Sequence, residues 1–207
     1  MRILLVLAAL VATPAPDVTK MVLTPSQVGD GYVLLQRRDG VGVKNTVTLD
    51  LCGRSGYPSE RQRLERLQVN YLKRGTTLGL SNEVVLYKKG GAAQAMREVV
   101  RHAVTCPKKP IPTGDPTLPP LRFEITRING TKLLKGYLAV RVRVTGTVKG
   151  RHVDETSYAV YQRFGDVLSG TYSFGPNTKA QLRFVLHAAQ QSAANLRRGR
   201  ANGGPTA

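Results

Sequence analysis

The stretch that decides the fold runs from Val84 to Lys109 and reads VVLYKKGGAAQAMREVVRHAVTCPKK. It begins with an apolar run, continues through two lysines and two glycines, and ends in an amphipathic segment that closes at Cys106. Apolar residues recur in that segment at the three- and four-residue spacing of one helical face, namely Ala92, Ala95, Met96, Val99, Val100, Ala103 and Val104. Because Pro107 follows directly, the helix should end there. The stretch therefore predicts a strand, a tight turn and a helix whose apolar face covers a core.

Short strands are expected on the N-terminal side of this stretch. Thr24 and Pro25 are typical of a helix N-cap and a first helical position, so a short helix should precede the strands. Alternating and β-branched apolar residues then predict four strands, of which the last two form a hairpin, at residues 31–38, 44–52, 66–75 and 80–89. A polar loop with a short helical turn should join the second strand to the third.

The C-terminal half repeats this order of strands followed by a helix. After the proline-rich connection 107–120, four further strands are expected, at residues 121–128, 137–148, 154–164 and 166–174. The last helix should begin at Asn177 or Thr178 and bury one stripe of side chains, namely Leu182, Val185, Leu186, Ala189, Ala193 and Leu196. Consecutive strands joined by short turns favour antiparallel pairing. The sequence predicts one α+β domain, an antiparallel β-sheet flanked by helices, spanning residues 23–198, with a disordered tail at 199–207.

The first residues, 1–15, resemble a secretory signal peptide. One arginine precedes an apolar run from Ile3 to Val11, and small residues and prolines follow it. That run is much shorter than the roughly 20 residues that a membrane-spanning helix needs. The alternative is a buried N-terminal strand or helix. The leader interpretation predicts a secreted protein of the cell envelope without a transmembrane span.

The two cysteines, Cys52 and Cys106, are the only ones in the chain. In an exported protein an isolated pair is most simply one disulfide. The alternative is two unpaired thiols in a cytosolic protein. Because the two cysteines are far apart and no cysteine–histidine cluster lies near either, they do not predict a zinc site.

The formal net charge of +18 is the strongest compositional feature. No acidic residue occurs between Glu124 and Asp154 or after Asp166, although basic residues are frequent in both regions. A positive field attracts anions such as phospholipid headgroups and phosphate polymers. The alternative is that the charge serves general solubility. Nucleic acid is disfavoured as the partner because no run matches the aromatic and basic strand motif of RNA-binding sheets.

Few residues are arranged for catalysis. His152 has Asp154 and Glu155 nearby in a predicted hairpin turn, but the sequence offers neither a nucleophile elbow nor further metal ligands. The expectation is therefore no enzyme, no cofactor and no metal site, with a hydrolase using His152 as an alternative.

The corner at Lys88, Lys89 and the paired glycines differs from a phosphate-binding P-loop, because its lysines precede the glycines. A helix N-terminus beside two lysines remains a candidate for weak anion binding, and the alternative is a plain strand-to-helix turn.

The order of these features resembles the extracellular sensor domains of actinobacterial PknH-type receptor kinases. The resemblance rests on LTPSQVG at 23–29, on Cys52, on the strand, helix and cysteine of 82–106, and on the closing portion 161–196. It implies an exported α+β domain with an antiparallel sheet and a cleft that receives a ligand. The Cys52–Cys106 pairing would also match the pattern of this family. The chain lacks a further cysteine pair that several members carry, and its paired glycines replace a turn that is usually rich in serine, aspartate and alanine.

Together these observations predict a non-catalytic, sensor-type binding protein that recognises an anionic ligand or a small molecule in a cleft. The longest predicted strand places Arg141 and Arg143 on the face opposite to Val140 and Val142. The candidate anion-binding residues are therefore Arg141, Arg143, Lys88 and Lys89. The alternative is an electrostatic adaptor or adhesin of the cell wall that has no pocket.

Overall fold

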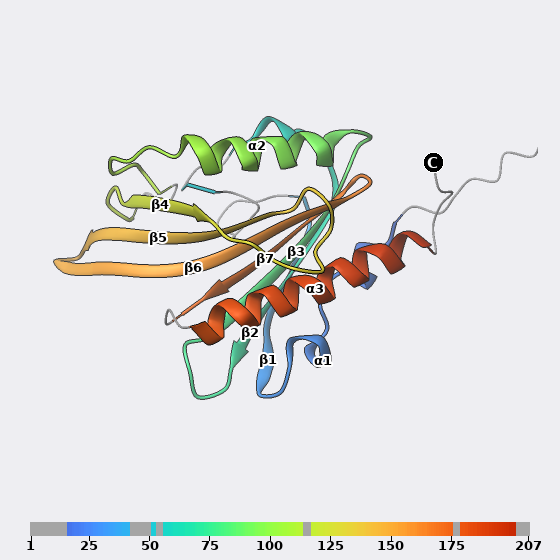
Figure 1. Ribbon diagram of the computed structural model, residues 1–207, viewed down its shortest axis with the longest axis horizontal. Coiled ribbons are helices and arrows are strands. Elements are labelled where there is room, and N and C mark those ends of the chain that lie inside the picture. Colours follow the sequence, from blue (N-terminus) through green and yellow to red (C-terminus); the bar gives the residue numbers. More distant parts are fainter. Residues whose placement is uncertain (1–15, 42–50, 53–55, 114–116, 176–178, 202–207) are drawn as a thin grey trace, which may run out of the picture.

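The computed structural model describes residues 16–41, 51–52, 56–113, 117–175 and 179–201. Within them the chain forms one domain, an open seven-stranded antiparallel sheet with three α-helices (Figure 1). The strands are β1 (Tyr32–Asp39), β2 (Arg63–Lys73), β3 (Gly79–Tyr87), β4 (Arg122–Arg127), β5 (Leu138–Val148), β6 (Arg151–Phe164) and β7 (Val167–Phe174). The helices are α1 (Pro25–Val28), α2 (Gly91–Thr105) and α3 (Lys179–Ala201), with 3-10 helices η1 (Val18–Lys20) and η2 (Pro58–Gln62). The expected α+β class with an antiparallel sheet is confirmed.

Two runs of strands merge into this one sheet. The strand order is β1-β2-β3-β7-β6-β5-β4, so the first half of the chain supplies three neighbouring strands and the second half supplies four. The expected hairpin before α2 is present as the pairing of β2 with β3. The two runs join where β3 pairs with β7, from Gly79 opposite Phe174 to Leu86 opposite Val167.

The two long helices cover opposite faces of the sheet, and in Figure 1 α2 lies at the top while α3 crosses the strands lower in the view. Along β3, Val85 packs in the same core as Ala92 of α2, whereas Val84 packs in the same core as Val185 of α3. This alternation follows from the two-residue period of a strand. Because both faces are covered, every residue of β3 is buried.

The predicted apolar face of α2 is confirmed except at its C-terminal end. The buried members are Ala92, Ala95, Met96 and Val99. Val100 and Ala103 are half-buried, and Val104 is 72% exposed. The expectation for Val104 was wrong because the last turn of α2 lies beside the edge strand β4, next to an open cavity.

The stripe predicted for the last helix is largely buried, with Val185, Ala189, Ala193 and Leu196 at most 1% exposed. Helix α3 continues to Ala201, so residues 199–201 are helical rather than part of a tail. The remaining tail, the expected leader at 1–15 and residues 44–50 of an expected strand lie outside the described residues.

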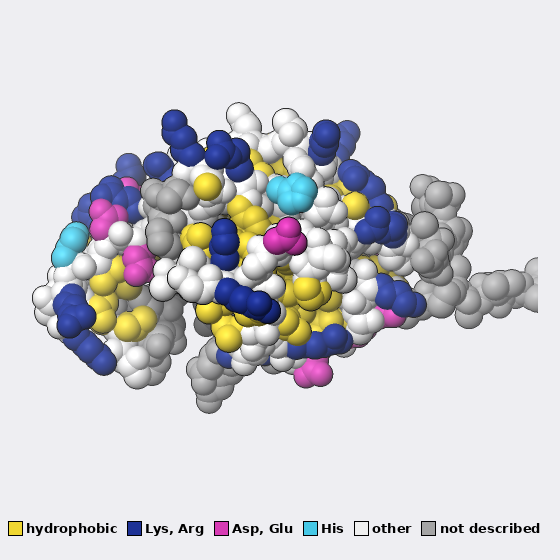
Figure 2. Space-filling view, turned by 90° about the horizontal axis from the view of Figure 1, so that it is seen from below, with side chains coloured by type: hydrophobic (Ala, Val, Ile, Leu, Met, Phe, Trp, Pro, Cys, Tyr) yellow, Lys and Arg dark blue, Asp and Glu magenta, His cyan; other side chains and the backbone are white. Residues whose placement is uncertain are grey.

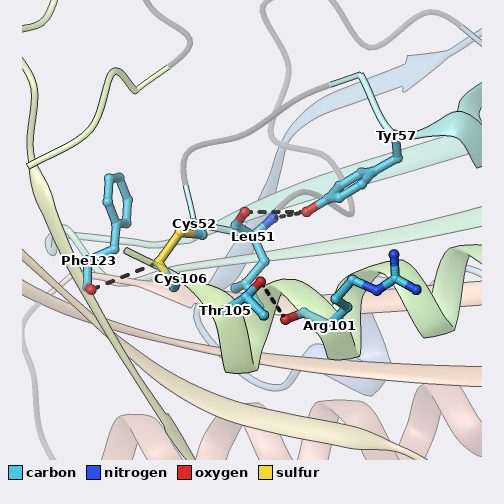
Figure 3. Close-up of a disulfide and its surroundings, with 7 residues drawn as sticks. All are labelled: Leu51, Cys52, Tyr57, Arg101, Thr105, Cys106 and Phe123. Atoms are coloured by element: carbon cyan, nitrogen blue, oxygen red, sulfur yellow. Dashed lines mark hydrogen bonds between the residues drawn. A yellow bond between two sulfur atoms is a disulfide. The ribbon is translucent and has the colours of Figure 1, made fainter. Parts of the chain in front are cut away.

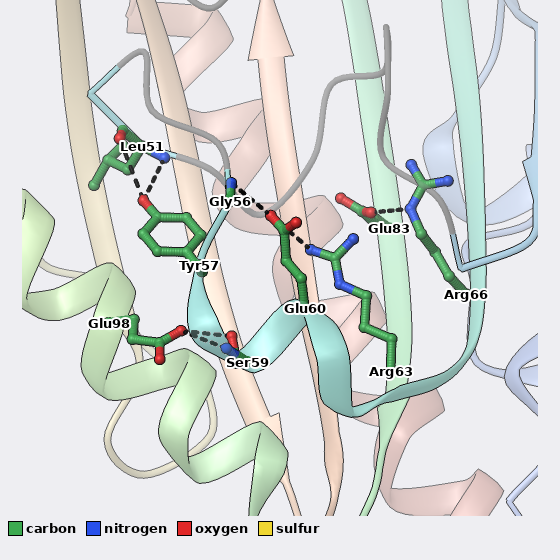
Figure 4. Close-up of polar contacts among 9 residues, drawn as sticks. All are labelled: Leu51, Gly56, Tyr57, Ser59, Glu60, Arg63, Arg66, Glu83 and Glu98. Carbon is green, nitrogen blue, oxygen red and sulfur yellow. Dashed lines mark hydrogen bonds and ion pairs between the residues drawn. The ribbon is translucent and has the colours of Figure 1, made fainter.

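A buried ion pair ties β2 to β3 (Figure 4). The Arg66 Nε donates to the carboxylate of Glu83, and both side chains are completely buried. Arg66 Nη2 also donates to Gln68 Oε1 at 2.8 Å, and Gln68 Nε2 donates to Ser81 Oγ at 2.9 Å. Burial raises the pKa of Glu83, and the charge of Arg66 acts in the opposite direction. This polar network occupies a position where the sequence pattern predicted ordinary strand packing.

Candidate functional site: a basic groove beside helix α2

One flank of α2 is tied down by the η2 segment. This flank carries Gln94, Glu98 and His102, spaced one helical turn apart. The Ser59 hydroxyl donates to Glu98 Oε2 at 2.5 Å, as Figure 4 shows. Gln62 Nε2 donates to Gln94 Oε1 at 2.6 Å. The Tyr57 ring packs edge-on against His102 with ring centroids 4.6 Å apart. These contacts fix the rotation of α2 about its axis, and therefore which side chains its opposite flank presents.

The opposite flank of α2 lines a cavity of about 400 Å³. Its lining residues are Ala93, Met96, Arg97, Val100, Arg101, Lys135, Gly136 and Arg163. The floor is apolar, formed by Met96 and Val100, and four basic side chains stand around it. We call this cavity the basic groove.

The four cations come from three separate segments of the chain. Arg97 and Arg101 lie one turn apart on α2, where like charges destabilise a helix slightly. Arg163 lies near the end of β6, and its Nη1 donates to the carbonyl of Gly165 at 3.1 Å. Lys135 precedes Gly136, whose φ of +76° makes the turn that leads into β5. None of these four residues was a candidate from the sequence, because their proximity depends on the packing of α2 against the β5–β6 end of the sheet.

All the charged residues that line the basic groove are positive. No acidic residue is among its lining residues. None of the four basic side chains forms an ion pair with a residue that the structure describes, and all four are exposed. Concave sites lined by one sign of charge concentrate counter-ions. An apolar floor with a few convergent polar groups is also typical of ligand sites. The groove is therefore suited to an anion that has an apolar part.

A second cavity of about 320 Å³ lies further along α2, beside the edge strand β4. Its lining residues are Ala103, Val104, Cys106, Lys108, Arg122, Phe123, Glu124 and Ile125. The Cys52–Cys106 disulfide, with Cα atoms 5.7 Å apart, closes the end of the helix, and the Cys106 Sγ lies 4.0 Å from the Phe123 carbonyl oxygen (Figure 3). The expected disulfide is thus present, and it anchors α2 next to β4.

The turn at Lys88 and Lys89 already contains an anion that belongs to the chain itself. Gly90 has a φ of +82°, and its amide donates to Asp166 Oδ1 at 2.9 Å. The carboxylate of Asp166 therefore occupies the place beside the helix N-terminus that an external anion would take. Both lysines are exposed.

The positive charge of Arg143 is likewise paired with carboxylates of the chain itself. Its Nε and Nη2 donate to the two carboxylate oxygens of Asp154 at 2.8 and 2.7 Å, and its Nη1 lies 3.7 Å from Glu124 Oε2. The bidentate contact lowers the pKa of Asp154. Arg141 is exposed and lies opposite Thr126 and Tyr158 in the neighbouring strands.

The four candidates from the sequence do not form one site. Arg143 pairs with Asp154 at the start of β6, whereas Lys88 and Lys89 lie next to Asp166, just beyond the end of the same strand. An extended strand of this length separates the two positions by roughly 30 Å. An anion site at Arg141 and Arg143, or at the lysines, stays a prediction, and the geometry favours the basic groove.

His152 lies exposed in β6, opposite Thr147 of β5, rather than in a turn. Its neighbour Asp154 is engaged by Arg143, so the carboxylate is not available to orient a histidine as in a catalytic triad. Among the described residues, no cluster of histidine, cysteine, aspartate and glutamate is arranged to hold a metal ion. The geometry therefore gives no support to a hydrolase that uses His152.

The basic charge is widely spread over the face that is seen from below in Figure 2. Figure 2 shows Lys and Arg side chains around much of the outline of this face rather than in a single patch. In the part of the chain that the structure describes, no helix has the length and hydrophobicity needed to cross a bilayer. Total charge alone therefore does not mark a site, whereas four cations around one cavity beside α2 do.

Comparison with known proteins gives a fold likeness at low sequence identity. No protein-family model matches the chain, and no curated protein matches its sequence. The extracellular domain of PknH from Mycobacterium tuberculosis is similar over 91% of this chain and 98% of that chain, with a TM-score of 0.60 and 11% identity. A putative uncharacterized protein from Mycobacterium smegmatis is similar over 89% of this chain and 98% of that chain, with a TM-score of 0.49 and 10% identity. The first likeness shows that this chain shares the fold of that extracellular domain.

Proposed function

We propose that this chain is a non-catalytic, extracytoplasmic binding domain that takes an anionic ligand in the basic groove. The observation that carries the proposal is the convergence of Arg97, Arg101, Lys135 and Arg163 on one cavity without a carboxylate in its lining. Like charges that are brought together repel one another, and an anion placed among them removes this repulsion. The cell envelope offers such anions as lipid headgroups and phosphate polymers.

The proposed location outside the cytoplasm has three supports. The leader-like residues 1–15 match the pattern of a signal peptide. The Cys52–Cys106 disulfide belongs to an oxidising compartment. The fold is shared with a domain described as extracellular. The exposed position of His152 counts against the alternative of a hydrolase that uses it.

The test compares two charge-matched variants. Isothermal titration with inorganic tripolyphosphate at low salt should show binding to the wild type. The double variant Arg97→Gln/Lys135→Gln should bind at least about tenfold more weakly, since each charge-assisted hydrogen bond contributes about 1.5–3 kcal/mol. Lys88→Gln/Lys89→Gln removes the same net charge outside the lining residues of the groove, and we expect less than about a threefold loss, because only the longer-range attraction is reduced.

The alternative function, an electrostatic adaptor without a pocket, is favoured by the spread of charge in Figure 2. It predicts equal losses in both double variants, because only net charge would then matter. Equal losses would refute the groove. A larger loss in Lys88→Gln/Lys89→Gln would instead assign the anion to the turn before α2.

A further inference from the structure

The basic groove and the second cavity lie along the same flank of α2. Ala93, Arg97 and Val100 line the first, and Val104 lines the second. These four positions follow one another at spacings of four, three and four residues, so they form one stripe of the helix. The two cavities therefore lie in line along one stripe of α2, and together they are called the channel below.

The two ends of this channel differ in chemistry. The end at Arg97 is surrounded by cations above an apolar floor. The other end exposes Val104 and is also lined by the half-buried side chains of Phe123 and Ile125. Exposed apolar surface can mark a ligand-binding groove, and ligand pockets combine an apolar lining with a few polar or charged groups.

The charges at the second end favour one orientation of such a ligand. Lys108 and Arg122 lie at that end, but Glu124 lines the same cavity and places a carboxylate there. An anionic head would meet that carboxylate at the second end and none among the lining residues at the first. The head therefore belongs near Arg97 and the apolar part near Val104. The seven-residue step between them corresponds to roughly 10 Å along the helix axis.

We infer that the channel binds one single-chain anionic amphiphile, with a phosphate or carboxylate head among Arg97, Lys135 and Arg163. Its aliphatic chain lies along α2 over Val100 and Val104 toward Phe123. The inference rests on the proposed function, because it places the head in the same groove. The ligand is a monomer held in a channel rather than the surface of a bilayer, because the cations surround a cavity between two elements of the fold.

The probes are octyl phosphate, butyl phosphate, inorganic phosphate and octanol, each titrated below the concentration at which it forms micelles. Octyl phosphate should bind more tightly than butyl phosphate, by about two- to fourfold for each added methylene group that gains contacts. Inorganic phosphate should bind most weakly of the three anions. Octanol, which lacks the charged head, should bind at least about tenfold more weakly than octyl phosphate.

Two variants locate the head and the chain. Val104→Gln introduces a residue with a higher helix propensity than valine. It should weaken the binding of octyl phosphate about three- to tenfold while leaving that of inorganic phosphate unchanged. Leu64→Gln is the matched control, because Leu64 is 53% exposed on β2 outside the channel. Arg97→Gln/Lys135→Gln should weaken the binding of every phosphate probe.

The outcomes separate this inference from the proposed function. If octyl phosphate and inorganic phosphate bind equally, or if Val104→Gln affects both equally, the amphiphile is wrong and the anion site stands. If Arg97→Gln/Lys135→Gln leaves all affinities unchanged, both are wrong. Binding to vesicles of anionic phospholipid that neither groove variant weakens would assign the charge to a membrane surface instead.

Discussion

The carboxylate of Asp166, in the turn between β6 and β7, accepts a hydrogen bond of 2.9 Å from the backbone amide of Gly90 at the start of α2. The backbone carbonyl of Asp166 also accepts the amide of Tyr87 at 2.9 Å. At the corner with two lysines and two glycines, these backbone amides thus find their hydrogen-bond acceptors within the chain. This pairing removes the strongest reason to place a ligand there.

Replacing Asp166 by Ala should destabilise the protein by about 1 kcal/mol, as is typical for the loss of a side-chain cap at a helix N-terminus. The melting temperature should fall by about 2–4 °C for a chain of this size. Thermal unfolding followed by circular dichroism measures this shift. Asp30→Ala, at an exposed position before β1, is the control. An unchanged melting temperature for Asp166→Ala would mean that the cap contributes nothing.

Gly91 and Gly90 are constrained in different ways. A Cβ at Gly91 would lie 2.8 Å from the Cβ of Tyr87 and 2.8 Å from Oε1 of Gln62, whereas a Cβ at Gly90 would meet nothing within 4 Å. Gly91→Ala should therefore destabilise the protein by about 1–3 kcal/mol, although alanine favours helix. Asparagine tolerates a positive φ, so Gly90→Asn should destabilise the protein by less than about 1 kcal/mol. Urea unfolding compares the two, and the reverse ranking would contradict the packing argument.

The Cys52–Cys106 disulfide closes a loop with a sequence separation of 54 residues. Its removal in Cys52→Ala/Cys106→Ala should lower the free energy of unfolding by about 2–4 kcal/mol, because the unfolded chain gains conformational freedom. Wild-type protein treated with a reductant should lose a similar amount, and the variant should not respond to the reductant. Alkylation of the unfolded, unreduced wild type should add no mass. One or two added alkyl groups would show that the thiols are free.

The buried Glu83 predicts a specific dependence of stability on pH. Burial raises its pKa in the folded chain above the ordinary value of 4.5, so the folded state binds this proton more readily than the unfolded state. The stabilisation linked to this proton is full below pH 4.5 and is lost as the pH rises through the raised pKa.

Glu83→Gln removes this titration. The stability of the wild type relative to Glu83→Gln should therefore decline as the pH rises, in urea unfolding measured from about pH 4 to pH 8. Glu65→Gln on the same strand pair is the exposed control. If the wild type instead gains stability over Glu83→Gln with rising pH, pairing with Arg66 outweighs burial.

Much of the local structure could be predicted from residue patterns. Thr24 is the N-cap of α1 and Pro25 its first residue, as predicted, and the backbone amide of Thr24 donates to Gln27 Oε1 at 3.0 Å. The helix that begins at the paired glycines and the buried stripe of α3 follow directly from the spacing of apolar residues. Val104 is exposed although it belongs to the apolar face of α2. The spacing of apolar residues predicts a helix face, but it does not predict how far the neighbouring sheet extends beneath that face.

The candidate site was much harder to predict. Arg143 was a reasonable candidate in the sequence because Asp154 is eleven residues away, and only the β5–β6 register brings the two side chains together. Arg97 and Arg101 lie on the polar face of α2 and are exposed. The same polar face also contains Glu98, which is bound to Ser59, and only this contact shows which flank stays open.

The sequence by itself determined the order of strands and helices, the amphipathic faces of α2 and α3, and the fact that the only two cysteines could pair with each other. These are properties of neighbouring residues, set by the periods of helix and strand. The tertiary structure alone decided that β3 pairs with β7, that Asp166 caps α2, and that Lys135 and Arg163 join Arg97 around one groove. Those contacts join segments far apart in the chain, whose pairing depends on the burial of whole faces rather than on any local pattern.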